Sequence, residues 1–189
     1  MLSVVALAGP ALAADQPCAQ PWVAGNPEGN YVVAGAMGDV AYRVANGRRL
    51  ALDAYVPPGS GPHPAAVLIH GGQWKNGSRV AHVRQLFEPL AAAGIAWFSL
   101  DYRLEPGSPM AAQDDLAEAL RFLRCHARKL RIDPDRMALI GEDTGATMAV
   151  LEAAENPAAY RAVVAVGGTF PDRPSPDAAF KLPANFPPM

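Results

Sequence analysis

The segment MALIGEDTGATMAV, residues 137–150, decides the fold class of this chain. Its first letters are apolar and suit a strand buried on both faces, whereas the letters after the second glycine follow the spacing of a buried helix. Gly141 and Gly145 flank the turn between them, where larger side chains would collide with the backbone. The frame of residues 141–145 is therefore G-x-D-x-G, and it predicts a sharp turn from strand to helix with the carboxylate of Asp143 projecting from its top.

The same alternation of strand and helix extends on both sides of this turn. Two alternating apolar runs around Asn46-Gly47 predict a β-hairpin. We expect hairpin strands at 39–45 and 49–56, buried strands at 65–69, 95–104, 137–141 and 161–168, helices at 79–93, 109–130 and 144–155, and a turn at 132–136. This order predicts an α/β fold, with a mainly parallel sheet, an N-terminal antiparallel hairpin and helices on both faces.

Composition excludes several classes of function. Half of the 189 residues are hydrophobic and 18% are charged, which is typical of one globular domain. A formal net charge of −2 gives no electrostatic reason to expect nucleic acid or an anionic membrane as a partner. The two cysteines lack C-x-x-C spacing, so the sequence does not suggest a zinc site.

The N-terminus has the pattern of an export signal. Residues 1–13 form a short apolar run ending in Ala11-Leu12-Ala13, which resembles the end of a secretory signal peptide. We therefore expect a secreted or periplasmic protein, and the run is too short to span a membrane. In that compartment Cys18 and Cys125 would be able to form a disulfide, although a buried thiol at Cys125 with an incidental Cys18 explains them equally well.

The chain divides into four parts by composition. An irregular leader follows the signal remnant, and six prolines with no regular period mark the C-terminal tail. The parts are a signal remnant at 1–13, a leader at 14–38, a core at 39–170 and a Pro-rich tail at 171–189.

Three segments carry a family resemblance. Residues 70–74 read H-G-G-Q-W after one predicted strand, and residues 101–104 read D-Y-R-L after the next. Followed by the G-x-D-x-G frame, one letter from the G-x-S-x-G nucleophile elbow, they resemble the α/β-hydrolase superfamily, in particular its secreted carboxylesterase and feruloyl-esterase-like branch. The resemblance covers about 39–170. It implies hydrolysis of a carboxylic ester, with a small-molecule ester or acid as partner and no metal or organic cofactor.

The resemblance also assigns roles to residues. Asp143 stands at the nucleophile position, and the backbone N–H groups of Gly72, Gln73 and Thr144 would hold a developing oxyanion, with Gly71 allowing close approach. Losing one such donor typically lowers the rate about 100- to 1,000-fold. Supporting roles fall to His70 and Trp74 in the loop and to Gly141 and Gly145 at the turn.

The carboxylate at the elbow leaves several interpretations open. A serine enzyme of this family takes its His and its acid from positions after the elbow, whereas the four histidines of this chain all precede it. The chain then represents the N-terminal two-thirds of an esterase or an impaired one. Alternatively, Asp143 is itself a nucleophile, as in dehalogenases and epoxide hydrolases, or the fold has become a binding module.

Two further expectations follow. Asp143 also suits the first turn of a helix, so a further interpretation is that it only caps the helix that follows. A sheet that stops after its sixth strand leaves an unpaired edge and an uncovered apolar face, which predicts self-association.

Overall fold

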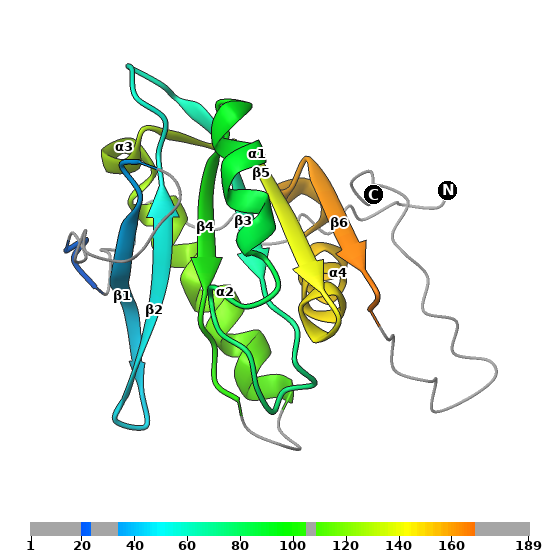
Figure 1. Ribbon diagram of the computed structural model, residues 1–189. Coiled ribbons are helices and arrows are strands. Elements are labelled where there is room, and N and C mark those ends of the chain that lie inside the picture. The colour runs from blue at the N-terminus through cyan, green and yellow to red at the C-terminus, as the bar shows by residue number, and fades with distance from the viewer. Residues whose placement is uncertain (1–19, 24–33, 105–108, 169–189) are drawn as a thin grey trace, which may run out of the picture.

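The computed structural model describes residues 20–23, 34–104 and 109–168, and its core is a six-stranded sheet in the order β1-β2-β4-β3-β5-β6 (Figure 1). The elements in chain order are β1 (Met37–Ala45), β2 (Arg48–Tyr55), β3 (His63–Ile69), η1 (Arg84–Leu86), α1 (Phe87–Ala92), β4 (Ala96–Leu100), α2 (Pro109–Cys125), α3 (Ala127–Leu130), β5 (Ile132–Glu142), α4 (Thr144–Glu155), η2 (Pro157–Ala159) and β6 (Ala162–Val166). The predicted signal remnant, Cys18 and the predicted Pro-rich tail lie outside the described residues.

All six predicted strands are present, and the predicted hairpin is confirmed. β1 pairs with β2 in antiparallel register around Asn46 and Gly47, whose φ angles are 51° and 73°. Two consecutive positive φ values are typical of the type I′ turn that Asn-Gly favours. β2 then pairs antiparallel with β4, which joins the hairpin to the parallel part of the sheet.

The parallel strands bring the two predicted site segments to one edge. β3 lies between β4 and β5, and β6 pairs with β5. Ile69 at the end of β3 is in register with Gly141 near the end of β5. The H-G-G loop and the G-x-D-x-G turn therefore begin at the C-terminal ends of two adjacent strands, as parallel pairing requires.

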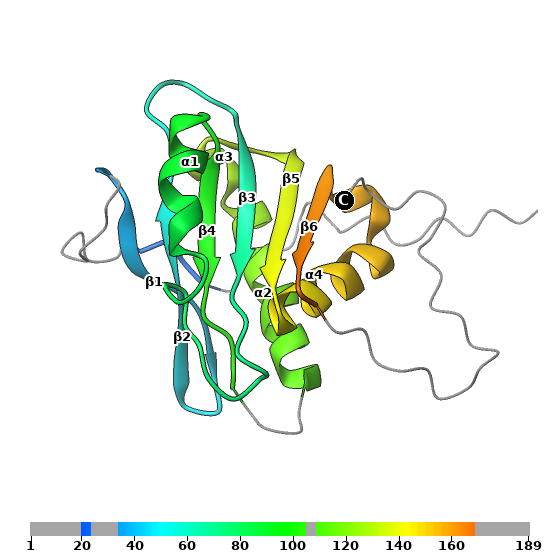
Figure 2. The ribbon, with the colours of Figure 1, turned by 45° about the vertical axis from the view of Figure 1, so that its right-hand side comes forward.

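Helices cover the two faces of the sheet unequally. The longer helices α2 and α4, with α3, lie behind the sheet and α1 lies in front of it (Figures 1 and 2). The main core is formed between the sheet and the helices behind it, whereas a smaller core surrounds Trp97 on the α1 side. There the rings of Phe87 and Trp97 stack with centroids 4.0 Å apart. The expectation of helices on both faces is confirmed.

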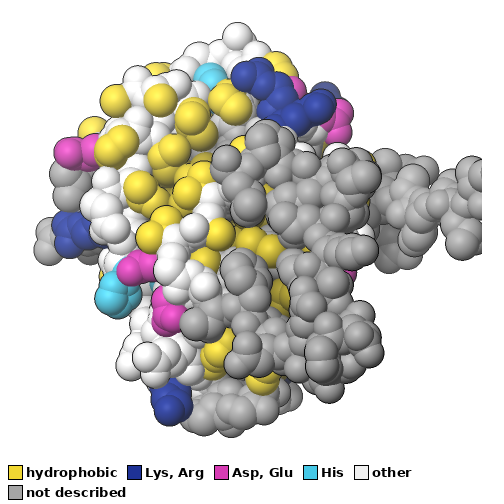
Figure 3. Space-filling model, turned by 90° about the vertical axis from the view of Figure 1, so that its right-hand side faces the viewer, with side chains coloured by type: hydrophobic (Ala, Val, Ile, Leu, Met, Phe, Trp, Pro, Cys, Tyr) yellow, Lys and Arg dark blue, Asp and Glu magenta, His cyan; other side chains and the backbone are white. Residues whose placement is uncertain are grey.

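The α1 side of β5 and β6 keeps apolar residues at the surface. Val164 and Val166 are 42% and 54% exposed, and hydrophobic side chains gather on this side of the molecule (Figure 3). A groove of about 510 Å³ beside α1 is lined mostly by apolar residues of β3 and β5. Within the described ranges, no helix has the length and apolar character needed to cross a membrane.

The helix predicted at 79–93 is confirmed only in its C-terminal part, from Arg84 to Ala92. Only the single turn η1 and the short α1 are helical in this range. The Arg79 guanidinium binds Asp53 and Asp101, and the Arg79 N–H donates to Asp101, so the segment is fixed to the ends of β2 and β4. His82 has a φ of 63°, which a right-handed helix does not allow. Ionic contacts to distant strands therefore override the helical spacing.

The predicted helix at 109–130 is interrupted at His126. This residue has φ −98° and ψ 8°, so α2 ends at Cys125 and the separate α3 follows. The ring of Trp22 stacks on Phe122 with centroids 5.7 Å apart, and Cys125 is disulfide-bonded. The apolar stripe remains buried on both pieces.

The turn predicted at 132–136 is also wrong. These residues belong to β5, which pairs with β3 through Ile132 and resumes at Met137 after an irregularity in the register. The polar letters mark a bulged stretch at the start of a strand rather than a break before it.

Candidate functional site

Asp143 occupies a strained turn between β5 and α4. Its φ and ψ are 49° and −117°, a conformation that costs a non-glycine residue roughly 1–3 kcal/mol. Backbone hydrogen bonds hold it there. The Asp143 N–H donates to the Val166 carbonyl at 2.8 Å, and the Asp143 carbonyl accepts from the N–H groups of Ala146 and Thr147. The turn thus continues the β5–β6 ladder and starts α4 at the same residue.

Three glycines let the turn and the loop after β3 approach each other. A Cβ atom on Gly145 would lie 2.1 Å from the carbonyl oxygen of Ile69, and one on Gly141 would lie 2.1 Å from that of Gly145. A Cβ atom on Gly71 would lie 2.8 Å from the Cβ of Asp143. Each position is therefore closed to any larger residue unless the backbone moves.

The loop after β3 directs two backbone donors at Asp143. Gly72 has a φ of 120°, and Gln73 and Trp74 follow with φ values of 55° and 56°. The Gly72 and Gln73 N–H groups donate to Asp143 Oδ2 at 3.0 Å and 3.1 Å. The two predicted oxyanion donors therefore already hold an anionic oxygen, and it belongs to the protein itself.

The environment of Asp143 favours the ionised form. Burial raises the pKa of the carboxyl, but the backbone N–H groups of Gly72, Gln73 and Thr144 and the nearby His82 outweigh burial and hold that pKa below its ordinary value of 3.8. The side chain makes no capping hydrogen bond to α4. Asp143 is therefore more than a helix cap, since its carboxylate accepts hydrogen bonds from the loop after β3.

The Tyr102 hydroxyl connects the loop after β3 to the first residue of α4. It donates to the His70 carbonyl at 2.7 Å and lies 3.5 Å from Thr144 Oγ1. The rings of His70 and Tyr102 stack with centroids 4.2 Å apart. Burial and the charge of Asp143 raise the pKa of Tyr102 to about 12, so this hydroxyl remains a donor.

His70 is a structural residue of the loop. Its side chain is 1% exposed, and its Nδ1 lies 2.7 Å from the carbonyl oxygen of Gly71. Burial lowers the pKa of His70, so the ring is neutral near pH 7. Trp74, by contrast, is half-buried and packs against the main core, with its Nε1 buried and without a hydrogen-bond partner.

The D-Y-R-L segment anchors the surroundings of the site. Asp101 binds Arg79, and Arg103 makes a bidentate contact with the fully buried Asp115 of α2 through Nε and Nη2. These ion pairs hold the loop before α1 and the chain after β4. Neither Asp101 nor Arg103 lines the pocket at Asp143.

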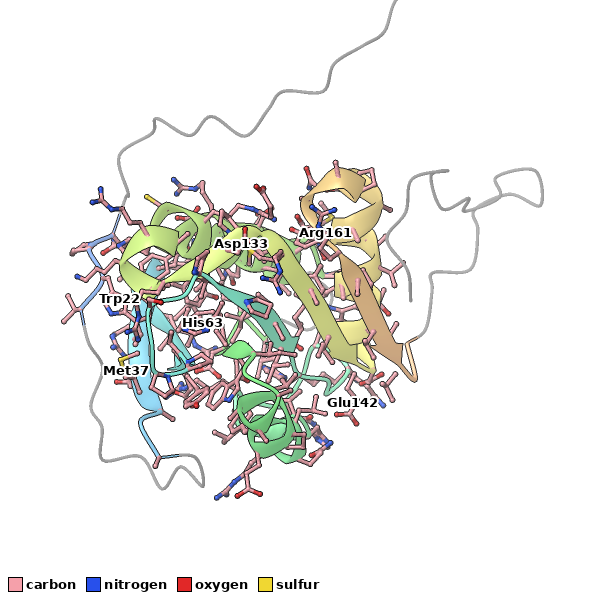
Figure 4. All side chains as sticks on the ribbon, turned by 90° about the horizontal axis from the view of Figure 1, so that it is seen from above. Trp22, Met37, His63, Asp133, Glu142 and Arg161 are labelled. Carbon is pink, nitrogen blue, oxygen red and sulfur yellow. The ribbon has the colours of Figure 1, made fainter. Side chains whose placement is uncertain are left out.

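A polar pocket of about 310 Å³ opens beside the turn. Its lining consists of Gly71, Gly72, Gln73, Asn76, His82, Glu142 and Asp143. His82 Nδ1 lies 3.7 Å from Glu142 Oε1, while Glu142 Oε2 is buried without a partner. Figure 4 labels Glu142 at the end of β5, away from Arg161, which precedes β6. In the described part of the chain, no group of three or more His, Cys, Asp or Glu side chains is arranged to hold a metal ion.

Three residues of the pocket carry little signal in the sequence. Asn76 belongs to an ordinary K-N-G-S turn, and Glu142 is a variable letter of the elbow frame. His82 falls within the helix predicted at 79–93, whereas the structure gives it a positive φ and places it in the lining of the pocket. For Glu142, the only signal in the sequence is its place within the G-x-D-x-G frame.

The geometry agrees with a family match over most of the core. Residues 52–164 match the model of the BD-FAE family. This chain belongs to the BD-FAE family. With its esterase relatives and structural neighbours, that membership makes it an α/β-hydrolase-fold protein of the esterase-like carboxylic-ester hydrolases.

Relatives of this BD-FAE chain include esterases and non-reducing polyketide synthases, both of greater length. It is 30% identical over 117 residues to ethyl acetate hydrolase of Pseudomonas putida, covering 60% of this chain and 37% of the relative. It is 34% identical over 91 residues to carboxylesterase NlhH of Mycobacterium tuberculosis, covering 48% and 28%. Esterase 2 of Thermogutta terrifontis superposes with a TM-score of 0.56 at 29% identity, covering 62% of this chain and 46% of the neighbour. The chain therefore spans less than half the length of these relatives.

Proposed function

We propose that this chain carries the anion-binding half of a carboxylic-ester hydrolase site, closed by Asp143, and that the chain itself does not hydrolyse esters. The observation that carries the proposal is the pair of hydrogen bonds from Gly72 and Gln73 to Asp143 Oδ2, at 3.0 Å and 3.1 Å. Acyl transfer needs such donors free for the oxyanion of the tetrahedral intermediate. A resident carboxylate occupies them and repels a second negative charge.

The positions of the four histidines support the same conclusion. Ester hydrolysis by the serine route needs an imidazole within hydrogen-bond reach of the nucleophile. Of the four histidines, only His82 lines the pocket, where it faces Glu142. His70 is buried under Tyr102 and His126 lies between α2 and α3. In the described part of the chain, the side chain at position 143 is hydrogen-bonded to Gly72 and Gln73 and not to a histidine, so a hydroxyl there would have no imidazole in direct contact to activate it.

Esters of short carboxylic acids are the substrate class that we propose for the ancestral site. One relative is an ethyl acetate hydrolase, and two of the neighbouring esterase 2 structures are described as propionate-bound and butyrate-bound. The small polar pocket beside Asp143 supports short acyl groups over long ones.

Hydrolysis of p-nitrophenyl acetate and p-nitrophenyl butyrate tests this proposal. We expect the native chain to match the uncatalysed rate, and we expect Asp143→Ser to do the same because the base is lacking. Asp135→Ala, a change at an exposed carboxylate of β5, serves as the matched control. Turnover by the native chain that Asp143→Ala abolishes and Asp135→Ala preserves would refute the proposal.

An aspartate nucleophile is the second candidate, and one observation favours it. The two amides hold one carboxylate oxygen as they would hold the carbonyl oxygen of an alkyl ester formed on Asp143. In such a reaction the other oxygen attacks an alkyl carbon and halide leaves. Water, losing a proton to His82, then attacks the Asp143 carboxyl carbon and releases an alcohol. A lowered pKa makes this carboxylate a weak nucleophile, and so we rank this candidate second.

Trapping of a covalent intermediate distinguishes the two candidates. The His82→Gln variant is incubated with a primary alkyl bromide and analysed by peptide mass spectrometry. The first proposal predicts no alkyl adduct on Asp143 beyond that on Asp135. An adduct specific to Asp143, hydrolysed when His82 is present, would establish the second.

We also propose that the protein is exported. The A-x-A pattern at 11–13 supports this, as does the disulfide bond at Cys125, because disulfides persist in oxidising compartments. Expression of the complete gene with and without residues 1–13, followed by fractionation, is the test. Retention of both forms in the cytoplasm would contradict the proposal.

Self-association through β6 is the last part of the proposal. β6 pairs only with β5 in the described sheet, and its exposed Val164 and Val166 support association with a second copy. We expect the isolated chain to form dimers or larger species by analytical ultracentrifugation, and Val164→Lys to reduce them. Val44→Lys, at a 60% exposed position on β1, is the control. A monomeric native chain would contradict this part.

A further inference from the structure

The amides of Gly72 and Gln73 form a two-donor site that is assembled without help from its occupant. The Gly72 carbonyl accepts hydrogen bonds from the N–H groups of Lys75 and Asn76 at 3.0 Å and 3.1 Å, so the loop closes on itself. The Tyr102 hydroxyl donates to the carbonyl of His70, two residues before Gly72, and so fixes the start of the loop. The two donors therefore stay in position whether or not a carboxylate is present.

The Asp143 side chain is also not needed to form the turn between β5 and α4. The backbone of Asp143 is held by its own hydrogen bonds to Val166, Ala146 and Thr147. Its side chain makes no capping hydrogen bond to α4. Its positive φ is a conformation that glycine adopts without strain. Removing the side chain therefore empties the two amides and leaves the backbone hydrogen bonds of the turn to Val166, Ala146 and Thr147 in place.

The pocket around the amides selects a small ligand with one negative charge. The amides supply two donors for one oxygen, and a charge-assisted pair of this kind suits a carboxylate. Glu142 lines the pocket with His82 beside it, at 3.7 Å, so a bound anion would meet one carboxylate and one imidazole. A ligand with several negative charges would meet Glu142 at close range, and the volume of about 310 Å³ favours a short chain.

We propose that this site binds the carboxylate group of a small monocarboxylic acid at the amides of Gly72 and Gln73, in competition with the chain's own Asp143 side chain. In the native chain, the Asp143 side chain therefore blocks a site that would otherwise bind a carboxylate. This inference rests on the proposed function, because both depend on Asp143 occupying the donors. It adds that the donors are exchangeable and names the ligand class.

Titration of three proteins with sodium formate and sodium acetate tests the inference. The native chain, Asp143→Gly and Asp143→Asn are compared by the amide signals of Gly72 and Gln73 in ¹⁵N-correlated NMR spectra, with sodium chloride at equal ionic strength as the reference. We expect saturable shifts of both amides in Asp143→Gly. The native chain is expected to bind at least about 100-fold more weakly, because its internal ligand is already oriented. Asp143→Asn places a neutral oxygen at the amides and should also resist formate.

The opposite results are equally clear. Equal response of the native chain and Asp143→Gly, or shifts that chloride reproduces, would overturn the inference. If Asp143→Gly does not give a dispersed spectrum, Asp143→Ala is titrated in its place under the same criteria. Absence of binding together with absence of ester turnover refutes only this inference, whereas ester turnover by the native chain refutes the proposed function.

Discussion

The loop after β3 and the turn after β5 meet at one edge of the sheet, and they differ in what they retain for acyl transfer. The loop keeps its two donors, oriented by the positive φ of Gly72 and Gln73. The turn keeps the backbone of an elbow but presents a carboxylate in place of a hydroxyl. The backbone of the turn, fixed by glycines and buried contacts, is compatible with an esterase elbow, whereas the Asp143 side chain is not the hydroxyl that such an elbow presents.

The largest expected effect comes from breaking the backbone that both segments share. Gly145→Ala puts a Cβ atom 2.1 Å from the Ile69 carbonyl oxygen. We expect a loss of about 3 kcal/mol or more in the free energy of unfolding, as for other severe overpacking. Chemical denaturation measures it.

Gly94→Ala is the matched control for this change. Gly94 also has a positive φ, but nothing lies within 4 Å of a Cβ built there. It should cost only about 1 kcal/mol. Equal effects of the two substitutions would show that the loop and the turn are not in contact at Gly145.

A smaller effect is expected from cutting the link between loop and turn. Tyr102→Phe removes the donor to the buried His70 carbonyl and should cost about 1–2 kcal/mol. Tyr42→Phe removes a similar bond, to the Asp101 carbonyl at 2.6 Å, away from the pocket. Both variants should lose similar stability in denaturation, but only Tyr102→Phe should shift the amide signals of Gly72 and Gln73. If Tyr42→Phe shifts them as much, the link is not specific.

A change of pH separates the contribution of the Asp143 carboxylate to stability from the contribution of the backbone of the turn. Because the pKa of Asp143 is lowered in the folded state, its stabilisation is present above the ordinary value of 3.8 and is lost as pH falls through the folded value. Asp143→Asn lacks this term, so the difference in unfolding free energy between the native chain and the variant should narrow from pH 6 to pH 3, by up to about 1 kcal/mol. Urea denaturation at the two pH values measures it, and a constant or widening difference would contradict the assignment.

The smallest effect concerns His82. It is one of the groups that lower the pKa of Asp143, but its side chain is 56% exposed and the interaction is screened by salt. His82→Gln should raise the pKa of Asp143 slightly at low ionic strength and have no measurable effect at 1 M salt. A large, salt-independent rise would mean that His82 bonds directly to the carboxylate.

The sequence predicted the fold better than the site. Buried apolar runs such as the one ending at Ile69 and the Asn46-Gly47 turn need only local information, and all six strands were found. The helix predicted at 79–93 begins only at Arg84, because Arg79 binds Asp53 on β2 and Asp101 just after β4, which spacing along the chain does not reveal. The meeting of the H-G-G loop with the elbow followed from parallel strand order.

The direction of the Asp143 side chain was beyond prediction from sequence. An aspartate at a helix start usually caps that helix, and local preference favoured this outcome. Its partners are instead Gly72 and Gln73, 71 and 70 residues earlier. Only the assembled edge of the sheet offers those two donors, and they compete successfully with the first turn of α4.

Titration of the Asp143 carboxyl carbon by ¹³C NMR, followed together with the Gly72 and Gln73 amides, tests the central claim most directly. We predict a midpoint below 3.8 for the carboxyl and the same midpoint for both amides, because one hydrogen-bonded unit gains a single proton. A carboxyl that titrates at or above 3.8, with amides that do not follow it, would show that Asp143 does not occupy the two donors.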